Sequence, residues 1–483
     1  MTLKIYNTQS RKKEEFLPLK DNKVGIYVCG ITAYDFCHVG HARSAVVFDV
    51  IVAYLRYRGY DVTYVKNFTD IDDKIIEKAK REGSGIKEIA ERYIVEHDLD
   101  MQKLHVAPPD VTPRATENIE GMINLVSTLL DKGLAYVMDG DVYYSVQNFP
   151  EYGKLSGRNL EEMMAGARID INEKKKNPLD FALWKASKEG EPWWKSPWGK
   201  GRPGWHIECS VMSQRYLGDT LDIHGGGEDL IFPHHENEIA QSEGATGKPF
   251  SRYWLHNGFV RVNSEKMSKS LGNFFTIRDI LAKYHPEVLR FFLLQSHYRS
   301  PVDFSDAALN EARQGMNRFY ATLRALQDIS ADSSDVSGGE NLTVSKEVEK
   351  LRDLFIEAMD DDFNTARAIG HLFDTVRVVN ASLAGGKKKV SPEAAENIKT
   401  KFIETGKVLG LFIDDPETYL LEDRKRETEK RNLNVAEIEN LIAERKAARS
   451  AKDWQRADEI RKELAEMGIS LRDTAGETIW IID

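Results

Sequence analysis

The chain contains 483 residues, and because a single hydrophobic core stops growing at roughly 250–300 residues, we expect several domains. Hydrophobic residues make up 41% and charged residues 30% of the sequence, with 34 Gly and 15 Pro, a composition that excludes collagen, mucin-like stalks and wholesale disorder. The formal net charge of −10 predicts a surface that repels nucleic acid unless basic residues gather locally.

The sequence contains no recognisable secretion or membrane signal. No apolar stretch follows the basic residues of Met1–Phe16, and nowhere do about 18 uncharged apolar residues run together. The sequence has three cysteines, Cys29, Cys37 and Cys209. They are too few for a disulfide framework, and an odd number would leave one of them unpaired. We therefore expect a cytoplasmic protein without a membrane partner, whose thiols are free, catalytic or metal-bound.

The first hundred residues alternate between strand and helix patterns. Val24–Cys29 is a β-favouring run that ends at Gly30, and Asp61–Val65 is a second such run. Between them, apolar residues of Ala45–Leu55 recur at helical spacing, and Gly59 is placed as a C-terminal cap. Strand, helix and strand in this order predict the βαβ unit of a parallel sheet.

The sequence His38-Val39-Gly40-His41 stands where this helix opens. Free backbone N–H groups and the dipole attract anions to a helix N-terminus, and a glycine there lets a ligand approach the backbone. Two imidazoles at such a place can grip a phosphate. An isolated pair of histidines is more often a pair of ordinary loop residues. The prediction of a phosphate site therefore depends on their place at the start of the helix.

Residues 108–203 break the strand and helix rhythm and predict an insertion. The parallel pattern returns at Thr220–Ile223 and at Tyr253–Val262. After the first of these strands come Gly225-Gly226-Gly227 and Asp229, which permit close approach of a ligand and hydrogen bonds to ribose hydroxyls or an amine. A glycine triplet alone is weak evidence, because such turns are common.

Soft and borderline metal ligands recur near the predicted sheet. Pro233 suits the first turn of a helix, on which His234 and Glu238 then share one face. Cys29 ends the first strand, and Cys209 can also reach the carboxyl edge of a parallel sheet, where ligands usually bind. Two thiolates, an imidazole and a carboxylate suit Zn²⁺.

The alternative for Cys29 is that of a small core residue in an apolar strand. His235 and Cys37 have no feature that requires them as ligands, and we expect both to be ordinary residues.

A second candidate phosphate-binding segment is Lys266-Met267-Ser268-Lys269-Ser270, with Gly272 close by. Two lysines around small polar residues suit a mobile loop that closes on polyphosphate. Alone, the segment is typical of a surface loop, but its combination with the histidine pair is far more specific.

The chain becomes helical after about Pro301. We expect exposed loops at Asp332–Gly339 and Gly385–Lys389 and a charged linker at Glu422–Asn434. Between Arg424 and Arg472 there are 13 Lys and Arg against 10 Asp and Glu, a local excess of positive charge that also fits a solvated helical face.

At this point the residues resemble a known family. His38–His41 resembles the HIGH motif, and Lys266–Ser270 the KMSKS motif, of class I aminoacyl-tRNA synthetases. Val39 replaces the usual Ile, a one-methylene change that we expect to be neutral. Further segments, from end to end, resemble the cysteinyl-tRNA synthetase family: Thr69–Lys74, Gly204–Ser210, His224–Leu230, Pro233–Glu238, Asp361–Thr365 and Lys452–Thr474.

The resemblance implies an α/β fold with a Rossmann-like, parallel-sheet catalytic domain that carries an insertion, followed by a helical bundle and a small C-terminal mixed α/β domain. The expected segments are the first catalytic half (1–107), the connective insertion (108–203), the second catalytic half with the KMSKS loop (204–315), the helical bundle (316–421) and the anticodon-binding domain (422–483).

The resemblance also implies that L-cysteine and ATP form cysteinyl-adenylate, and that the cysteinyl group passes to the 3′-terminal adenosine of tRNA(Cys). Such catalysis is mostly positioning and electrostatics. Mg²⁺ is expected to accompany ATP. The implied catalytic residues are His38, His41, Lys266 and Lys269, and the implied ATP-binding residues are Gly40, Gly226, Gly227, Asp229 and Lys269.

One zinc ion per chain, held by Cys29, Cys209, His234 and Glu238, is the implied means of selecting sulfur over the nearly isosteric serine hydroxyl. Because four protein ligands usually form a closed structural site, this role requires a five-coordinate ion or a loosened Glu238. Further residues are expected to contact the rest of the cysteine: Gly30, Thr69 and Trp205.

In the tail, the implied anticodon-reading residues are Arg449, Trp454, Asp458 and Asp473. They offer a guanidinium, a stacking platform and two acceptors, which suit unstacked bases. The alternative is that Trp454 is a core residue and Asp458 a surface charge.

Two other functions stay open at this stage. A related enzyme class joins cysteine to a small amino sugar and should lack the anticodon-reading tail. A non-catalytic RNA-binding paralogue should have lost one of the catalytic histidines or lysines, and all four are present. The resemblance further suggests a monomer.

Overall fold

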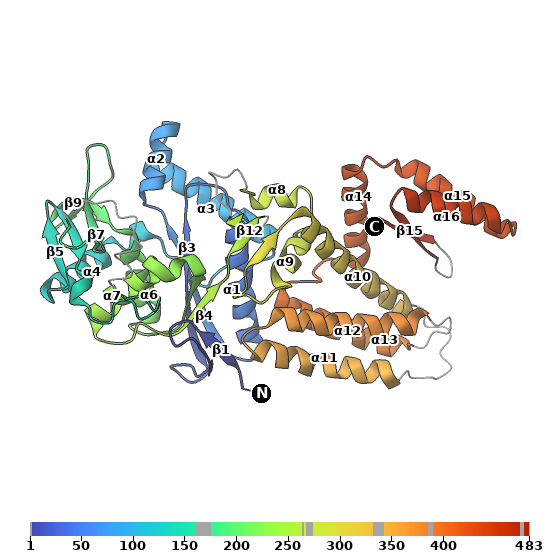
Figure 1. The fold of residues 1–483 in the computed structure, drawn as a ribbon, viewed down its shortest axis with the longest axis horizontal. Coiled ribbons are helices and arrows are strands. Elements are labelled where there is room, and N and C mark those ends of the chain that lie inside the picture. Colours follow the sequence, from blue (N-terminus) through green and yellow to red (C-terminus); the bar gives the residue numbers. More distant parts are fainter. Residues whose placement is uncertain are drawn as a thin grey trace.

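The computed structural model describes residues 2–159, 175–262, 265–266, 274–331, 342–384, 390–473 and 478–482. The molecule is elongated, with the insertion at one end, the parallel sheet beside it, a helical bundle further along and the C-terminal unit at the far end (Figure 1). The predicted loops Asp332–Gly339 and Gly385–Lys389 lie outside the described residues.

A four-stranded parallel sheet organises the first part of the chain. Its order is β11 (Ser251–Asn257), β10 (Leu221–Gly227), β3 (Lys23–Thr32) and β4 (Asp61–Thr69). The helix α1 (Val39–Tyr57) connects β3 to the parallel β4 and confirms the predicted βαβ unit. The other elements around this sheet are β1 (Lys4–Asn7), β2 (Lys12–Glu15), α2 (Asp73–Glu82), α3 (Ile86–Lys103), α6 (Trp205–Leu217) and α7 (Glu236–Thr246).

Three of these strands are longer than the sequence patterns predict. β3 continues through Gly30 to Thr32, β4 continues past Val65 to Thr69, and β10 includes the glycine triplet instead of ending before it. The reason at Gly225 is packing, because a Cβ atom there would lie 2.3 Å from the Phe48 ring of α1. The glycines therefore let α1 approach the sheet closely while the strand continues.

The insertion contains a five-stranded antiparallel sheet with its own hydrophobic core. α4 (Ile119–Asp131) packs beside it. The strands, in spatial order, are β5 (Ala135–Met138), β6 (Asp141–Tyr144), β7 (Phe181–Ala186), β9 (Gly199–Pro203) and β8 (Trp194–Ser196).

A third sheet links the catalytic region to the helices that follow. It has the order β13 (Glu265–Lys266), β12 (Val260–Val262) and β14 (Val302–Phe304). Two short helices, α8 (Ile277–Leu281) and α9 (Pro286–Leu294), lie between β13 and β14 in the chain.

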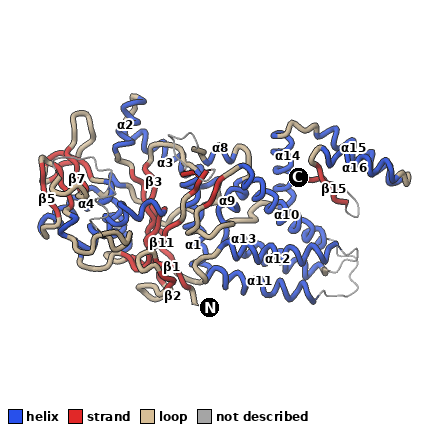
Figure 2. Tube along the Cα trace, viewed as in Figure 1, coloured by secondary structure: helices blue, strands red, loops and turns tan. Residues whose placement is uncertain are grey.

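Helices dominate after β14, as Figure 2 shows in blue. They are α10 (Asp306–Ala331), α11 (Leu342–Asp360), α12 (Thr365–Ala384), α13 (Pro392–Leu409) and α14 (Pro416–Lys430). The linker predicted at Glu422–Asn434 is therefore wrong for most of its length. The segment is rich in charged residues and so resembles an exposed linker, but it forms a helix whose buried face includes the charged residues Asp423 and Glu427.

The C-terminal unit consists of α15 (Val435–Ser450), α16 (Trp454–Glu466) and the hairpin of β15 (Ile469–Asp473) and β16 (Thr478–Ile482). Its apolar residues form a small core of their own. None of the helices among the described residues combines the length and the apolar character needed to cross a bilayer.

A single buried guanidinium joins four parts of the catalytic region and the bundle. Arg290 of α9 is 1% exposed and donates a hydrogen bond to Asp49 of α1. It also donates to the carbonyl oxygens of Leu104 and His105 after α3, at 3.1 Å each, and to that of Leu409 at the end of α13, at 2.6 Å. These acceptors lie at the end or on the flank of three helices, α1, α3 and α13, so this one side chain fixes how they meet α9.

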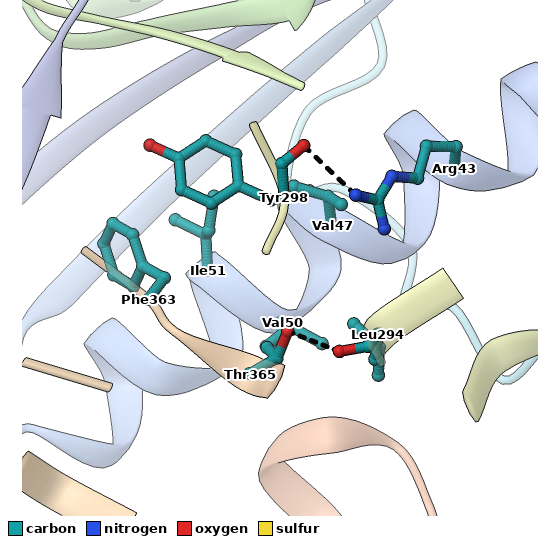
Figure 3. Close-up of a pocket in the computed structure, with 8 residues that line it drawn as sticks. All are labelled: Arg43, Val47, Val50, Ile51, Leu294, Tyr298, Phe363 and Thr365. Carbon is teal, nitrogen blue, oxygen red and sulfur yellow. Dashed lines mark hydrogen bonds between the residues drawn. The ribbon is translucent and has the colours of Figure 1, made fainter. Parts of the chain in front are cut away.

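A second buried guanidinium, Arg43 of α1, binds the corner that follows α9. A small, largely apolar pocket between α1 and the turn before α12 lies beside it (Figure 3). Thr365 of α12 donates to the carbonyl oxygen of Leu294 at 2.8 Å and so attaches the bundle to the same corner. The carbonyl oxygens bound by Arg43 belong to Leu293, His297, Tyr298 and Ser300.

Substitution of Gly410 tests the Arg290 joint. Gly410 ends α13 with φ +65°, and a Cβ atom there would lie 2.3 Å from Cζ of Arg290. Gly59, with φ +89° and no atom within 4 Å of its Cβ position, is the matched control. We expect Gly59→Ala to cost about 1–2 kcal/mol, for the left-handed backbone alone. Gly410→Ala should lower the thermal unfolding midpoint by clearly more, because Arg290 must also move. Equal shifts would contradict the role given to Arg290.

Candidate functional site

The two signature histidines form the cap of α1. The Nδ1 atom of His38 accepts a hydrogen bond from the Gly40 backbone N–H at 3.0 Å, and the His38 N–H donates to Nδ1 of His41 at 3.2 Å. The two rings stack with centroids 3.7 Å apart. Because each Nδ1 accepts, the neutral imidazoles carry their protons on Nε2, where they can be donated to a phosphate oxygen. Val39 between them is fully buried, as expected of an apolar slot.

The segment Phe274–Ile277 lies against this helix start. The Val39 N–H donates to the carbonyl oxygen of Phe275 at 3.2 Å, and the Ile277 N–H donates to that of Cys37 at 2.9 Å. Lys266 lies on β13, opposite Arg261 of β12. The side chain of Lys266 and the whole of Lys269 lie outside the described residues.

Four predicted metal ligands meet in one buried cluster. Cys29 comes from β3, Cys209 from α6, His234 from the helical turn η4 (Ile231–His235) and Glu238 from α7. The two sulfur atoms are 3.7 Å apart, Sγ of Cys29 is 3.3 Å from Oε1 of Glu238, and Nε2 of His234 is 3.0 Å from that same oxygen. Pro233 lies within η4, not in the first turn of the α-helix, which begins at Glu236.

Two of these three separations, 3.7 and 3.3 Å, match a tetrahedral zinc ion, and the third, 3.0 Å between His234 and Glu238, is a shorter ion-pair contact. With Zn–S bonds of about 2.3 Å and Zn–N or Zn–O bonds of about 2.0–2.2 Å, tetrahedral donors lie roughly 3.3–3.8 Å apart. All four donor atoms of the cluster lie within 4.8 Å of one another. The cluster therefore has both the donor chemistry and the spacing for a divalent metal.

Two further histidines approach the same cluster. Nε2 of His235 lies 3.3 Å from Sγ of Cys29, and Nε2 of His224 lies 3.8 Å from that sulfur and 3.3 Å from Oε2 of Glu238. Cys29, His224, His235 and Glu238 thus form a second possible ligand set. Sequence reasoning did not single out His224 and regarded His235 as ordinary. The signal for His224 was its place on the strand beside Cys29, directly before the glycines.

Cys37 lies apart from both sets. It is buried, and burial raises the pKa of its thiol to about 12, so it remains an unreactive thiol.

The four-residue cluster holds charges of both signs: burial raises the pKa of the Cys29 thiol well above its usual value, and Glu238 and Cys209 raise the pKa of His234 to about 10 against the effect of burial. The hydrogen bond from Cys29 lowers the pKa of the Cys209 thiol to about 6, against the effect of burial. Burial favours the neutral form of Glu238, but the neighbouring His224 and His234 hold its pKa well below the usual range. A thiolate and a carboxylate in a buried site attract a divalent ion, and sulfur with nitrogen selects a borderline-soft one.

The predicted substrate residues surround this cluster. Gly30 follows Cys29, and a Cβ atom on it would lie 1.5 Å from the carbonyl oxygen of Asn67, so only glycine fits. The hydroxyl of Thr69, at the end of β4, donates to Oε2 of Glu208 at 2.8 Å. The ring of Trp205 is 42% exposed and lies over His234, with centroids 4.2 Å apart. Gly30 and Trp205 are thus next to metal ligands, and Thr69 is linked to them through Glu208, the neighbour of Cys209.

The glycines of β10 lie at the same edge of the sheet. A Cβ atom on Gly226 would lie 2.9 Å from the His235 ring, and one on Gly227 would lie 2.5 Å from Oδ1 of Asp229. Asp229 belongs to the short turn η3 (Glu228–Leu230) and is exposed. The structure therefore brings these three residues near the metal cluster, at the carboxyl end of parallel strands.

The predicted anticodon residues are far from this cluster, in the C-terminal unit (Figure 1). Trp454 is 60% exposed at the start of α16, which excludes the alternative of a core tryptophan. Arg449 on α15 and Asp458 on α16 are also exposed, and Asp473 ends β15.

Known protein families match three segments of this chain, and known relatives match nearly all of it. The family described as "tRNA synthetases class I (C) catalytic domain" matches residues 15–314, the "DALR domain" residues 354–413, and the "Cysteinyl-tRNA ligase anticodon binding domain" residues 435–480. The cysteine--tRNA ligase of Trichlorobacter lovleyi is 56% identical over 488 residues, and that of Geobacter sulfurreducens is 56% identical over 482 residues. In both cases the match covers 99% of this chain and 99% of the relative.

Solved structures share the fold at low sequence identity. Mycobacterium tuberculosis methionyl-tRNA synthetase with methionyl-adenylate superposes with a TM-score of 0.59 at 16% identity, covering 80% of this chain and 89% of that one. The leucyl enzyme LeuRS (agnB2) of Agrobacterium radiobacter K84, in a ternary complex with tRNA, gives a TM-score of 0.59 at 11% identity, covering 83% and 87%. These likenesses support the class I synthetase fold.

The zinc content of two variants shows which of the two ligand sets binds the metal. We expect Cys209→Ser to lose bound zinc at least about 10-fold, because the variant lacks the thiolate that best fits a tetrahedral ion. His235→Asn should retain zinc, and Cys37→Ser, which removes a thiol outside both sets, is the matched control. Plasma mass spectrometry after dialysis against equimolar zinc measures the content. Zinc kept by Cys209→Ser but lost by His235→Asn would assign the metal to the other set.

Proposed function

The chain belongs to the cysteine--tRNA ligase family of class I aminoacyl-tRNA synthetases, and we propose that it selects L-cysteine through one zinc ion held by Cys29, Cys209, His234 and Glu238. The observation that carries the proposal is the buried cluster itself, in which two thiols, an imidazole and a carboxylate place their donor atoms within 4.8 Å of one another. The reaction is ATP-dependent: cysteine is activated to its adenylate and then joined to the 3′-terminal adenosine of tRNA(Cys).

The activation step places negative charge on phosphate oxygens. The cysteine carboxylate attacks the α-phosphorus, and the bond to pyrophosphate breaks. We assign His38 and His41 to these oxygens, since their cap geometry directs Nε2–H donors away from the helix start, and Gly40 to close approach of ATP. Lys266 and Lys269 are assigned to the leaving pyrophosphate, and Mg²⁺ to ATP.

The adenosine and the amino acid are assigned to the edge of the sheet. Gly226, Gly227 and Asp229 are proposed to bind the adenosine part of ATP. Gly30, Thr69 and Trp205, which surround the cluster, are proposed to contact the rest of the cysteine substrate. The second step is attack of a ribose hydroxyl on the adenylate carbonyl, with AMP as the leaving group.

Zinc, when bound, supplies a direct bond to the substrate sulfur. A pocket that reads size alone separates small groups by about 1–3 kcal/mol, which is too little to exclude serine. A site rich in thiolate and imidazole prefers a thiol to a hydroxyl, because sulfur is the softer ligand. The buried carboxylate of Glu238 is the ligand that we expect to loosen when the substrate binds.

The C-terminal unit is proposed to read the tRNA anticodon through Arg449, Trp454, Asp458 and Asp473. The exposed Trp454 ring offers a stacking surface, as unstacked bases require. The alternatives of an amino-sugar acceptor and of a non-catalytic paralogue are not favoured, because the match to cysteine--tRNA ligases extends through the tail. We further propose that the chain acts as a monomer in the cytoplasm.

Pyrophosphate exchange tests the amino acid and the metal together. We expect ATP–pyrophosphate exchange with cysteine and none with serine, and we expect exchange to collapse when zinc is removed by a chelator and to return when zinc is added back. Matched samples with added magnesium but no zinc control for general metal loss. Exchange that continues without zinc would make the metal structural and return the selection of cysteine to pocket shape.

Replacement of Trp454 tests the anticodon assignment. Because loss of base stacking costs about 1–3 kcal/mol, Trp454→Ala should lower kcat/KM for tRNA(Cys) by about 5-fold to 100-fold. Exchange with cysteine should be unchanged. Trp193→Ala, which removes a tryptophan of similar exposure (48%) in the insertion, is the control for general surface effects. Full charging by Trp454→Ala would remove this residue from the assignment.

A further inference from the structure

The C-terminal unit meets the rest of the molecule through a small, mostly polar joint. Its core is a separate cluster that, among the described residues, does not merge with the core of the bundle. The residues of that cluster are Ile438, Ile442, Ile460, Leu464, Ile469, Trp480 and Ile482. A unit without a shared apolar core is expected to move relative to its neighbour unless specific contacts fix it.

The specific contacts are made by arginines of the bundle. Nη2 of Arg313, on α10, donates to the carbonyl oxygen of Ile482 in β16 at 3.3 Å. The guanidinium of Arg424, on α14, lies 4.5 Å from the centre of the Trp480 ring. The Trp480 N–H in turn donates to Glu439 of α15 at 2.9 Å, so the ring is held on both sides.

Arg313 is itself held in place by buried partners. Its Nη1 donates to Oδ2 of Asp423 at 2.9 Å, and Asn317, one turn along α10, donates to the same oxygen at 2.7 Å. Arg313 and Asp423 are 2% and 6% exposed. Glu427, one turn along α14, adds a carboxylate 3.9 Å from Nε of Arg313. The guanidinium therefore has one fixed orientation, and its planar fork directs Nη1 to Asp423 and Nη2 to Ile482, a geometry that the compact ammonium group of lysine does not fix.

The joint is close to the catalytic region. α10 begins at Asp306, two residues after β14, and Arg313 lies seven residues further, roughly 10 Å along the helix axis. β14 pairs with β12, which pairs with the strand that carries Lys266. The same helix that holds β16 is thus anchored on the sheet next to the ATP site.

We propose that Arg313 is a positioning residue for tRNA, whose guanidinium fixes β16 and so sets the orientation of the anticodon-reading unit relative to the catalytic domain. The proposal rests on the proposed function, because it concerns the distance between the two ends of one tRNA. Pre-orientation of the unit removes an ordering cost from tRNA binding. Arg313 has no part in amino acid activation.

Kinetics with two RNA substrates test this role. In Arg313→Lys, which keeps the charge but loses the fork, we expect KM for full-length tRNA(Cys) to rise about 10-fold or more, with kcat within about 2-fold. Exchange with cysteine should be unchanged, and so should charging of an acceptor-stem minihelix, which lacks the anticodon. The exposed Arg318→Lys, on the same helix, is the matched control. If Arg313→Lys does not fold, Arg424→Gln tests the other side of the joint with the same expectations.

The results that would overturn the positioning role of Arg313 differ from those that would overturn the proposed function. An unchanged KM for full-length tRNA would overturn the positioning role, and so would a parallel loss with the minihelix or in exchange, because the defect would then lie in the catalytic domain. Absence of exchange and charging in the wild-type chain would instead overturn the proposed function.

Discussion

The buried guanidinium of Arg290 determines how the catalytic region and the helical bundle fit together. Its acceptors come from α1, from the chain after α3 and from the end of α13. Removal of one partner from a buried ionic contact typically costs about 3–5 kcal/mol, because the other charge is left uncompensated. Arg290 thus fixes the position of α1, whose first turn carries the two histidines, relative to the helical bundle. Arg43 adds a second such contact two residues after His41.

On this frame, the site is built where parallel strands end. β3 and β10 are neighbours and supply Cys29 and His224, while α6 and α7 supply Cys209 and Glu238. The strands bring the thiol of Cys29 and the imidazole of His224 to one edge of the sheet, and the helices add Cys209 and Glu238 from the side. Close approach at Gly30 leaves no room for a side chain beside the metal ligands. The result is a cluster that is buried, with an exposed Trp205 at its border.

The sequence predicted some of these features from local pattern alone. The βαβ unit was predicted from the spacing of apolar residues and from the turn residues that follow them. The shared helix face of His234 and Glu238 was predicted because they are four residues apart. The meeting of Cys29 with Cys209 depends on long-range packing: the sequence allowed both to reach the carboxyl edge of the sheet, and the family resemblance joined them in one ligand set. His224 was missed because a single histidine in a strand has no local signature, and its nearness to Cys29 follows only from the pairing of β10 with β3. The helix through Glu422–Lys430 was missed because its buried face is charged, and the partners that make the burial of Asp423 acceptable, Arg313 and Asn317, lie more than a hundred residues away.

The separation of the cluster in the chain has a consequence for synthesis. Cys29 and Cys209 are 180 residues apart, and a ribosome that adds roughly 5–20 residues each second needs about 10–40 s to cover that distance. During this time the thiol of Cys29 lacks the partners that later bury it. The proposed metal site can therefore form only at a later stage of synthesis, after α6 and α7 have supplied Cys209 and Glu238.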